Sequence, residues 1–556
     1  MTLLPTYKAA VVQFEPTLFE KEENIRRLGR LVEEAGEKGA RLVVTPEMGT
    51  TGYCFKSREE IAPYVEPVPG PATAVFGEIA RRYSMYVVIS LPEVDPATGV
   101  YYNAAALIGP DGEVAGKFRK VHSFVDETLW AKDGDLGFPV FDTPLGRLAM
   151  IICMDADFFE SGRVPALKGA DVICFPTNWV TKTPAKSWRA RALENGVYFL
   201  AADRWGEERG IRFGGGSSII GPRGEVMATV ERGDAVVTGE ISIRATRDKN
   251  VPGFGDLLGA RRPEEYHAVI TNPYLWQPVL LTRLPGGRRS RLTVAQFDPV
   301  AGRPGENLAT MATILEEACE APASGTSGPG PSPYLSPHVV VFPELCVTGM
   351  PPAAEMKDLA EPVPGPATDR LAGIAAEFEA HVVFGIAEVD CDGAVYNSAV
   401  VLEPGGLAGV YRKVHLNEYD REWAAPGNLG LPCFDISAGR TGVAIGTDLL
   451  IPEVARCLAK QGADVILAPS AWPWPEWDFV WSERAANNDV YLAVSNQAGR
   501  SVVYGDPSRR QASKVEGAAG FASLEMDTEM DSFCRRKEML RKVQPVWYDP
   551  IVRKRP

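Results

Sequence analysis

A chain of 556 residues is too long for a single hydrophobic core, so two or more domains are expected. The hydrophobic fraction of 45% and the charged fraction of 23% are typical of globular proteins. The formal net charge of −14 argues against a nucleic-acid partner, and the apolar runs are too short to cross a bilayer, so no membrane partner is expected either.

The cysteine and histidine content limits the chemistry that the chain can perform. Nine cysteines are present, an odd number, without a C-x-x-C pair or a Cys/His cluster at zinc spacing. Only five histidines occur, which disfavours a metal site or a Cys–His dyad. The first residues lack a basic stretch followed by an apolar one, so no secretory signal is expected. We therefore expect a cytoplasmic protein that uses neither a metal nor an organic cofactor.

In the first half of the chain, short apolar runs alternate with helical patterns. The strand candidates are 8–14, 41–45, 86–91, 102–108, 147–153 and 171–175. The helix candidates are 21–37, 71–83, 160–168 and 184–195. Glu22 and Glu23 lie at the positive end of the first helix, and Gly39 ends it. This alternation predicts layered α/β domains in which the sheets are buried between helices.

The second half of the chain repeats the first. AVVQFEPTLFEKEENIRRL from Ala10 returns as TVAQFDPVAGRPGENLATM from Thr293, and FRKVH from Phe118 returns as YRKVH from Tyr411. The order and spacing of such segments indicate that a whole domain was duplicated. We predict one domain over 1–280, a polar linker over 281–291 and a second domain over 292–556.

For three other segments, the sequence favours a structural role over a binding function. The basic cluster Arg288, Arg289 and Arg291 falls at the predicted join, where a solvated connector is favoured over a binding patch. The Pro/Gly/Ser-rich stretch 321–338 predicts a mobile surface loop. The glycines at 214–216 lack the G-K-[ST] of a phosphate loop, so a tight turn is favoured.

Three residues able to do chemistry recur at the ends of predicted strands: Glu47, Lys120 and Cys153. Taken singly, they read as a solvated acid, a surface lysine and an inert core thiol. Taken together, they offer a nucleophile, a carboxylate that can deprotonate it and an ammonium that can stabilise an oxyanion. The combination favours covalent catalysis by the thiol.

The segments TPEMGTTGY, RKVH and IICMDADFFE resemble the three signature segments of the nitrilase, or carbon–nitrogen hydrolase, superfamily. They occur in the family's order with similar spacing, and the resemblance covers nearly all of the first copy and, more loosely, most of the second. It implies an α/β fold of two tandem α-β-β-α sandwich domains. It also implies that Glu47 is the general base, that Cys153 is the nucleophile, and that Lys120 and the backbone N–H of Met154 stabilise the oxyanion.

The resemblance implies further site residues around this triad. Glu127 occupies the place of a second glutamate that holds the substrate or assists the base. Asn178 and Trp179 would lie near the pocket wall; a loop residue and a core aromatic are the alternatives. Asp157 could attract a cationic substrate, although a structural acid near a helix start is an equal alternative.

The second copy retains Glu344 and Lys413 but places Gly446 where the first copy has Cys153. Thr447 lacks an adjacent base and Cys346 is expected to pack, so neither replaces the thiol. We therefore expect a pseudo-domain. Because members of the family commonly pair domains into dimers, the two copies are expected to pair within one chain, and a homo-oligomer is a further possibility.

The residues after the nucleophile bear on the substrate. True nitrilases usually have Cys-Trp-Glu, whereas this chain has Cys153-Met154-Asp155, which favours a small amide or ureido substrate cleaved through a thioester. The alternatives are a nitrilase acting on a nitrile and a non-catalytic binding or scaffold protein.

Overall fold

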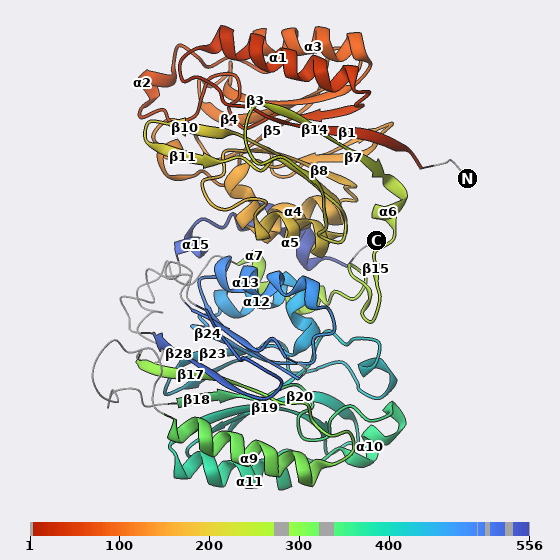
Figure 1. Ribbon diagram of the computed structural model, residues 1–556, viewed down its shortest axis with the longest axis vertical. Helices are drawn as coiled ribbons and strands as arrows, with labels where there is room; N and C mark the ends of the chain where they lie inside the picture. Colours follow the sequence, from red (N-terminus) through yellow and green to blue (C-terminus); the bar gives the residue numbers. More distant parts are fainter. Residues whose placement is uncertain are drawn as a thin grey trace. The chain divides into compact units, whose positions relative to one another are not determined.

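The computed structural model describes residues 4–271, 288–321, 338–497, 499–505, 512–528 and 538–554. The chain forms two compact units (Figure 1). Unit 1 consists of Met1–Lys249 together with Val546–Ile551, and unit 2 consists of Asn250–Pro545 together with Val552–Pro556. Among the described residues no helix has the length and apolar character needed to span a membrane.

The first sheet of unit 1 has six strands in the order β14-β1-β2-β3-β4-β5. They are β1 (Thr6–Gln13), β2 (Leu42–Val44), β3 (Tyr86–Val94), β4 (Tyr101–Ile108), β5 (Val114–Arg119) and β14 (Ala235–Ser242). Strands β1, β2 and β3 are parallel, and the remaining pairs are antiparallel. Helices α1 (Lys21–Glu37) and α3 (Pro71–Tyr83) pack their apolar faces on this sheet through Leu28, Val32 and Phe76.

The second sheet of unit 1 has the order β13-β12-β9-β8-β7-β6. Its strands are β6 (Val140–Thr143), β7 (Gly146–Met150), β8 (Val172–Thr177), β9 (Tyr198–Asp203), β12 (Ser218–Ile220) and β13 (Val226–Thr229). Strands β8 and β9 are buried at every position, as expected for parallel strands covered on both faces. Helices α4 (Phe159–Leu167) and α5 (Lys186–Asn195) lie on the opposite side of unit 1 from α1 and α3, which confirms the α-β-β-α sandwich (Figure 1).

Shorter elements of unit 1 connect the sheets. They are α2 (Arg58–Ile61), η1 (Val125–Leu129), η2 (Cys153–Asp157), β10 (Trp205–Glu208), β11 (Ile211–Gly214) and α6 (Ile243–Arg247). The predicted helices and strands are present, but the strand predicted over 147–153 ends at Met150. Cys153 instead begins a 3₁₀ turn with a positive φ of 45°, because the chain turns sharply from β7 into η2. The bend places the thiol at the edge of the sheet rather than in its core.

Unit 2 repeats this architecture. Its first sheet comprises β17 (Arg289–Gln296), β18 (His338–Val341), β19 (Ala380–Val389), β20 (Val395–Glu403), β21 (Gly406–Arg412) and β28 (Gly520–Asp527). Its second sheet comprises β22 (Cys433–Ile436), β23 (Gly439–Val443), β24 (Val465–Ser470), β25 (Tyr491–Asn496), β26 (Val502–Tyr504) and β27 (Ala512–Lys514). The strand orders, β21-β20-β19-β18-β17-β28 and β22-β23-β24-β25-β26-β27, match those of unit 1 strand for strand.

The helices of unit 2 also match those of unit 1. Helices α9 (Pro304–Glu320) and α11 (Pro366–Glu377) cover one side of the unit, and α12 (Pro452–Lys460) and α13 (Phe479–Ala486) cover the other (Figure 1). The shorter elements are β15 (Asn250–Val251), β16 (Gly255–Asp256), η3 (Pro263–Glu265), α7 (His267–Ile270), η5 (Ala353–Glu355), α10 (Met356–Leu359), η6 (Asp420–Glu422), η7 (Gly446–Leu450), η8 (Pro475–Trp477), α15 (Glu538–Arg541), η9 (Pro545–Trp547) and η10 (Asp549–Val552).

The compact units divide the chain differently from the predicted domains 1–280 and 292–556. Residues 250–271 were predicted to belong to the first domain, but they follow α6 and pack within unit 2. There Arg261 Nε lies 2.7 Å from Glu453 Oε1, and Lys460 Nζ donates to the Val269 carbonyl at 2.8 Å. Of the predicted linker 281–291, Arg289 and Arg291 belong to β17, and 281–287 lie outside the described residues. The predicted loop 321–338 lies outside them as well, except for its two end residues.

A buried asparagine fixes the start of the first helix in both units. Asn24 Oδ1 accepts the Thr17 N–H at 2.8 Å, and Asn24 Nδ2 donates to the Thr17 carbonyl at 2.7 Å. Asn307 makes the same pair of bonds with Val300, each 2.8 Å long. The amide therefore satisfies backbone groups where the chain enters the helix.

We expect Asn24→Ala to destabilise unit 1 by about 1–3 kcal/mol, because it leaves a backbone N–H and a carbonyl near the core without partners. Urea unfolding followed by fluorescence and circular dichroism would measure the loss, with Arg30→Ala on the exposed side of α1 as the control. A free energy of unfolding equal to that of the control would contradict this role.

Candidate functional site

A buried cluster of charges lies at the carboxyl ends of strands in the first sheet of unit 1. Glu47 follows β2 and Lys120 follows β5, and Lys120 Nζ lies 2.8 Å from Glu47 Oε1. Both side chains are almost fully buried, at 0% and 1% exposure. Two strands that are remote in sequence thus bring the predicted base and the predicted oxyanion donor into direct contact.

Glu127 and Asn103 complete this cluster. Lys120 Nζ lies 2.6 Å from Glu127 Oε1, so the ammonium binds two carboxylates. Asn103, in β4, donates from Nδ2 to Glu47 Oε1 at 2.7 Å and to Glu127 Oε1 at 3.1 Å. Phe124 N–H donates to Glu127 Oε2 at 3.0 Å, which fixes the second glutamate in η1. The four side chains form one rigid network.

Cys153 lies beside this network and comes from the second sheet. Its left-handed backbone conformation is unfavourable for a residue with a Cβ, and the surrounding bonds hold it in place. One of them runs from Ile152 N–H to Asp155 Oδ2, at 3.0 Å. Burial raises the pKa of the Cys153 thiol well above its usual value, and the charge of Glu47 adds to this, whereas Lys120 opposes it. The thiol is therefore neutral at rest and requires a base.

Glu47 has the properties of that base. Burial raises the pKa of Glu47 to about 7, opposed by Lys120 and assisted by the charge of Glu127. Its Oε1 is held by Lys120 and Asn103, whereas its Oε2 is buried without a hydrogen-bond partner among the described residues. Burial disfavours the Lys120 ammonium, but Glu127 and Glu47 outweigh this and keep the pKa of Lys120 above its usual value. The cluster thus holds a permanent cation beside a carboxylate that titrates near neutrality.

The structure places the remaining predicted site residues as follows. Met154 is buried in the first turn of η2, directly after the thiol. The backbone of Asn178 lowers the pKa of the Cys153 thiol, against the rise that burial causes. Both polar atoms of the buried Asn178 side chain lack a partner within the described ranges. Trp179 is half-buried, and its indole donates to Thr181 Oγ1 at 2.7 Å and packs edge-on against Trp188. Asp157 is the last residue of η2, four residues after Cys153.

Three site residues were missed by the sequence analysis. Asn103 has a signal, since the pair Tyr102-Asn103 returns as Tyr396-Asn397 in the second copy. Tyr53 lies within TPEMGTTGY, and burial, with the charges of Glu127 and Glu47, raises its pKa. Asp203, at the end of β9, accepts the Trp179 N–H at 2.8 Å, and burial raises its pKa well above the usual value. No sequence pattern pointed to Asp203.

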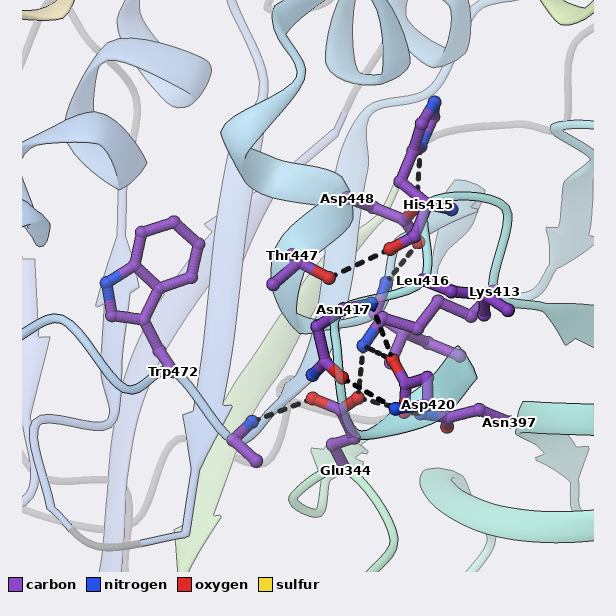
Figure 2. A network of polar contacts seen from close by, with 12 residues as sticks. Glu344, Asn397, Lys413, His415, Leu416, Asn417, Asp420, Thr447, Asp448 and Trp472 are labelled. Carbon is purple, nitrogen blue, oxygen red and sulfur yellow. Dashed lines mark hydrogen bonds and ion pairs between the residues drawn. The ribbon is translucent and has the colours of Figure 1, made fainter. Parts of the chain in front are cut away.

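The second copy keeps the charge network without the nucleophile (Figure 2). Lys413 Nζ lies 2.6 Å from Glu344 Oε1 and 2.6 Å from Asp420 Oδ2. Asn397 Nδ2 donates to Glu344 Oε1 at 2.8 Å and to Asp420 Oδ1 at 2.9 Å. Asp420 therefore takes the place of Glu127, and Asn397 that of Asn103.

Unit 2 has no room for a side chain at the position that Cys153 occupies in unit 1. Gly446 has nearly the same backbone conformation as Cys153, with a φ of 44°. A Cβ atom added to Gly446 would collide with Glu344 Oε2, and that oxygen accepts the Ala471 N–H at 2.9 Å. The Thr447 hydroxyl donates to the His415 carbonyl at 2.9 Å, away from Glu344 (Figure 2). Unit 2 thus presents neither a nucleophile nor an unpartnered Glu344 oxygen.

In the described part of the chain, no group of three His, Cys, Asp or Glu side chains is placed to hold a metal ion.

Comparison with known proteins gives concordant results. A family model described as carbon-nitrogen hydrolase matches residues 8–249 and again 291–526. The chain is 41% identical over 261 residues to a nitrilase of Pyrococcus abyssi, which covers 47% of this chain and 98% of that protein. It is 32% identical over 253 residues to an omega-amidase of Xenopus laevis, which covers 43% and 89%. A solved amidase structure from Nesterenkonia sp. matches with 26% identity and a TM-score of 0.39, over 44% of this chain and 92% of that one.

We expect Gly446→Ala to destabilise unit 2 by about 1–3 kcal/mol more than Gly393→Ala does, because only the first pushes a Cβ into a carboxylate held by three donors. Gly393 has a φ of 79°, and no atom lies within 4 Å of a Cβ added to it. The stability lost in Gly393→Ala therefore measures backbone strain alone. Chemical denaturation of the two variants would measure the difference. Equal losses would mean that Glu344 moves aside freely.

Proposed function

The chain belongs to the carbon–nitrogen hydrolase family, and on that premise we propose that unit 1 cleaves a non-peptide C–N bond of a small amide or N-carbamoyl compound. The observation that carries this proposal is the pairing of a buried neutral thiol at Cys153 with a nearby carboxylate, Glu47, whose second oxygen has no partner in the described structure. A carboxylate in that state can accept a proton from the thiol.

In the first half of the reaction, the Cys153 sulfur attacks the carbonyl carbon while Glu47 takes the thiol proton. The C–N bond then breaks, and Glu47 gives this proton to the departing ammonia or amine. The acyl group remains on sulfur as a thioester. A base with a pKa near 7 suits both directions of proton transfer at neutral pH.

Two donors support the oxyanion in this proposal. An ammonium has three N–H donors, and Lys120 spends two on Glu47 and Glu127, which leaves one for the substrate oxygen. The backbone N–H of Met154 lies in the first turn of η2, where N–H groups have no partner within the turn. Such preorganised donors are worth roughly 3 kcal/mol each in the transition state.

In the second half, Glu47 removes a proton from water, and the resulting hydroxyl attacks the thioester carbonyl. The C–S bond breaks, the carboxylic acid leaves and Cys153 regains its proton from Glu47. Glu127 and Asn103 keep the side chains of Glu47 and Lys120 in position during both half-reactions. The unpartnered Asn178 amide is suited to orient the substrate, with Trp179 beside it.

For the substrate, we favour an amide or ureido group over a nitrile. Met154 and Asp155 follow the nucleophile in place of the Trp-Glu usual in nitrilases, and several similar proteins are omega-amidases. The similarity to a nitrilase of Pyrococcus abyssi supports the nitrile as the second candidate. A panel of small amides, ureido compounds and nitriles, with ammonia and acid quantified separately, distinguishes the two.

We expect Cys153→Ala to lower kcat/KM on the best amide by on the order of 10³-fold or more, because no other group in the proposed mechanism can carry the acyl. The matched control is Cys174→Ala, which removes another buried thiol from the adjacent strand β8. Ammonia release and the acyl adduct seen by intact mass should both vanish only in the first variant. Turnover unchanged in Cys153→Ala would refute the proposal.

The pH dependence of kcat/KM should reflect the ionisation of the Glu47 carboxyl group. Because its carboxylate must be ionised to act as the base, kcat/KM is expected to fall about tenfold per pH unit below a pKa near 7. Glu127→Gln removes a charge that raises the pKa of Glu47, so the acid limb should move to lower pH. Asp420→Asn, the equivalent change in unit 2, should leave the limb in place; a shift of the limb in both variants, or in neither, would contradict this assignment.

A further inference from the structure

The last segment of unit 1 comes from the part of the chain that was predicted as the second domain, and it follows β28, the last strand of unit 2. Val546–Ile551 belongs to unit 1, and within it Tyr548 is fully buried. The Tyr548 hydroxyl lies 3.0 Å from His122 Nε2. His122 stands two residues after Lys120 and stacks face to face on Phe158, with ring centroids 3.8 Å apart. A residue from the far end of the chain thus contacts the segment that carries the oxyanion donor.

From His122 the contacts continue to the nucleophile. His122 Nδ1 lies 2.7 Å from Asp155 Oδ1, and the His122 backbone N–H donates to the same oxygen at 3.0 Å. The other oxygen of Asp155 accepts the Ile152 N–H at 3.0 Å, immediately before Cys153. Asp155 therefore ties the turn that carries the thiol to the segment that follows Lys120.

The chemistry of the three groups sets the direction of each bond. An ionised carboxylate only accepts, so His122 Nδ1 donates to Asp155. In the neutral ring Nε2 is then the acceptor, and Tyr548 donates its O–H to it. Asp155 thus sets the tautomer of the imidazole, and the bond from Tyr548 fixes the orientation of the ring that holds Asp155.

The turn needs such support because Cys153 adopts a strained left-handed conformation. We propose that Tyr548 is a positioning residue for catalysis, acting through His122 and Asp155 on the alignment of Cys153 and of the Met154 N–H. The proposal rests on the function proposed above. It gives the second copy a purpose without chemistry of its own, since the segment that follows this copy supplies the tyrosine.

Unit 2 contains an equivalent set of contacts. Tyr266, in the segment that follows the first copy, lies 2.6 Å from His415 Nε2, and His415 Nδ1 lies 2.8 Å from Asp448 Oδ1 (Figure 2 shows the second contact). Asp448 accepts the Ile445 N–H at 3.0 Å, immediately before Gly446. The same bonds therefore hold a turn without a nucleophile, which makes Tyr266→Phe a control for the loss of one buried hydroxyl.

The experiment compares Tyr548→Phe with Tyr266→Phe in the full chain. We expect Tyr548→Phe to lower kcat about tenfold with KM unchanged, because the substrate still binds while the thiol is misaligned. Peptide mapping after iodoacetamide should show slower alkylation of Cys153, with the exposed Cys391 as the internal reference. Tyr266→Phe should change neither quantity. Equal kcat in Tyr548→Phe and the parent, or an equal loss in both variants, would overturn the proposal.

A double-mutant cycle separates positioning from a general loss of stability. His122→Asn keeps a donor near Asp155 but cannot reach Tyr548, so adding Tyr548→Phe to it should cost nothing further. Additive losses would overturn the proposed route through His122, and circular dichroism of each variant would verify folding. The alkylation rate needs no substrate, so it tests Tyr548 even where the amide panel gives no turnover. Conversely, turnover that survives Cys153→Ala refutes the proposed function and leaves the alkylation comparison valid.

Discussion

The site depends on one buried ammonium held between two carboxylates. Lys120 contacts Glu47 and Glu127 in a place from which water is excluded, and an uncompensated charge there would be very costly. The two acids compensate the cation, while Lys120 limits the rise in the pKa of Glu47 that burial causes. Because the three charges come from three different segments, their network also fixes the geometry of the loops after β2 and β5. Stability and chemical readiness therefore come from the same set of bonds.

The candidate site of unit 1 and its counterpart in unit 2 differ in few groups. Both copies retain the network of a lysine, an asparagine and two carboxylates. Both also have a residue with a positive φ in the turn after a strand of the second sheet, Cys153 after β7 and Gly446 after β23. In unit 1 the turn carries a thiol, and Glu47 Oε2 has no partner in the described structure. In unit 2 the turn carries glycine, which adopts this conformation without strain, and Glu344 Oε2 binds a backbone N–H. In unit 2 the absence of a thiol thus coincides with a hydrogen-bond partner for Glu344 Oε2.

Much of this could be predicted from the sequence. Periodicity and the repeat gave the principal helices and strands, because hydrophobic patterns dictate which faces are buried. Glu47 and Lys120 were predicted because each follows a strand in a short motif, whereas Glu127 was predicted only from the resemblance to the family; the structure brings the three side chains together. Asp203 was missed because a single polar residue at a strand end carries no local signal, and Asn103 was missed although it recurs as Asn397 in the second copy. The packing of 250–271 in unit 2 and of 546–551 in unit 1 was also missed, because pattern analysis assigns a segment to the domain that it follows.

Because residues 546–551 belong to unit 1, the order in which the chain is synthesised matters for that unit. The first copy leaves the ribosome hundreds of residues before Tyr548 is synthesised. Until then the imidazole beside the nucleophile's turn has no phenol to bind. With the positioning role proposed for Tyr548, a polypeptide that stops before this residue would carry the thiol in a turn without that support. Dividing the chain between its repeats would likewise separate residues 250–271 from unit 2 and residues 546–551 from unit 1.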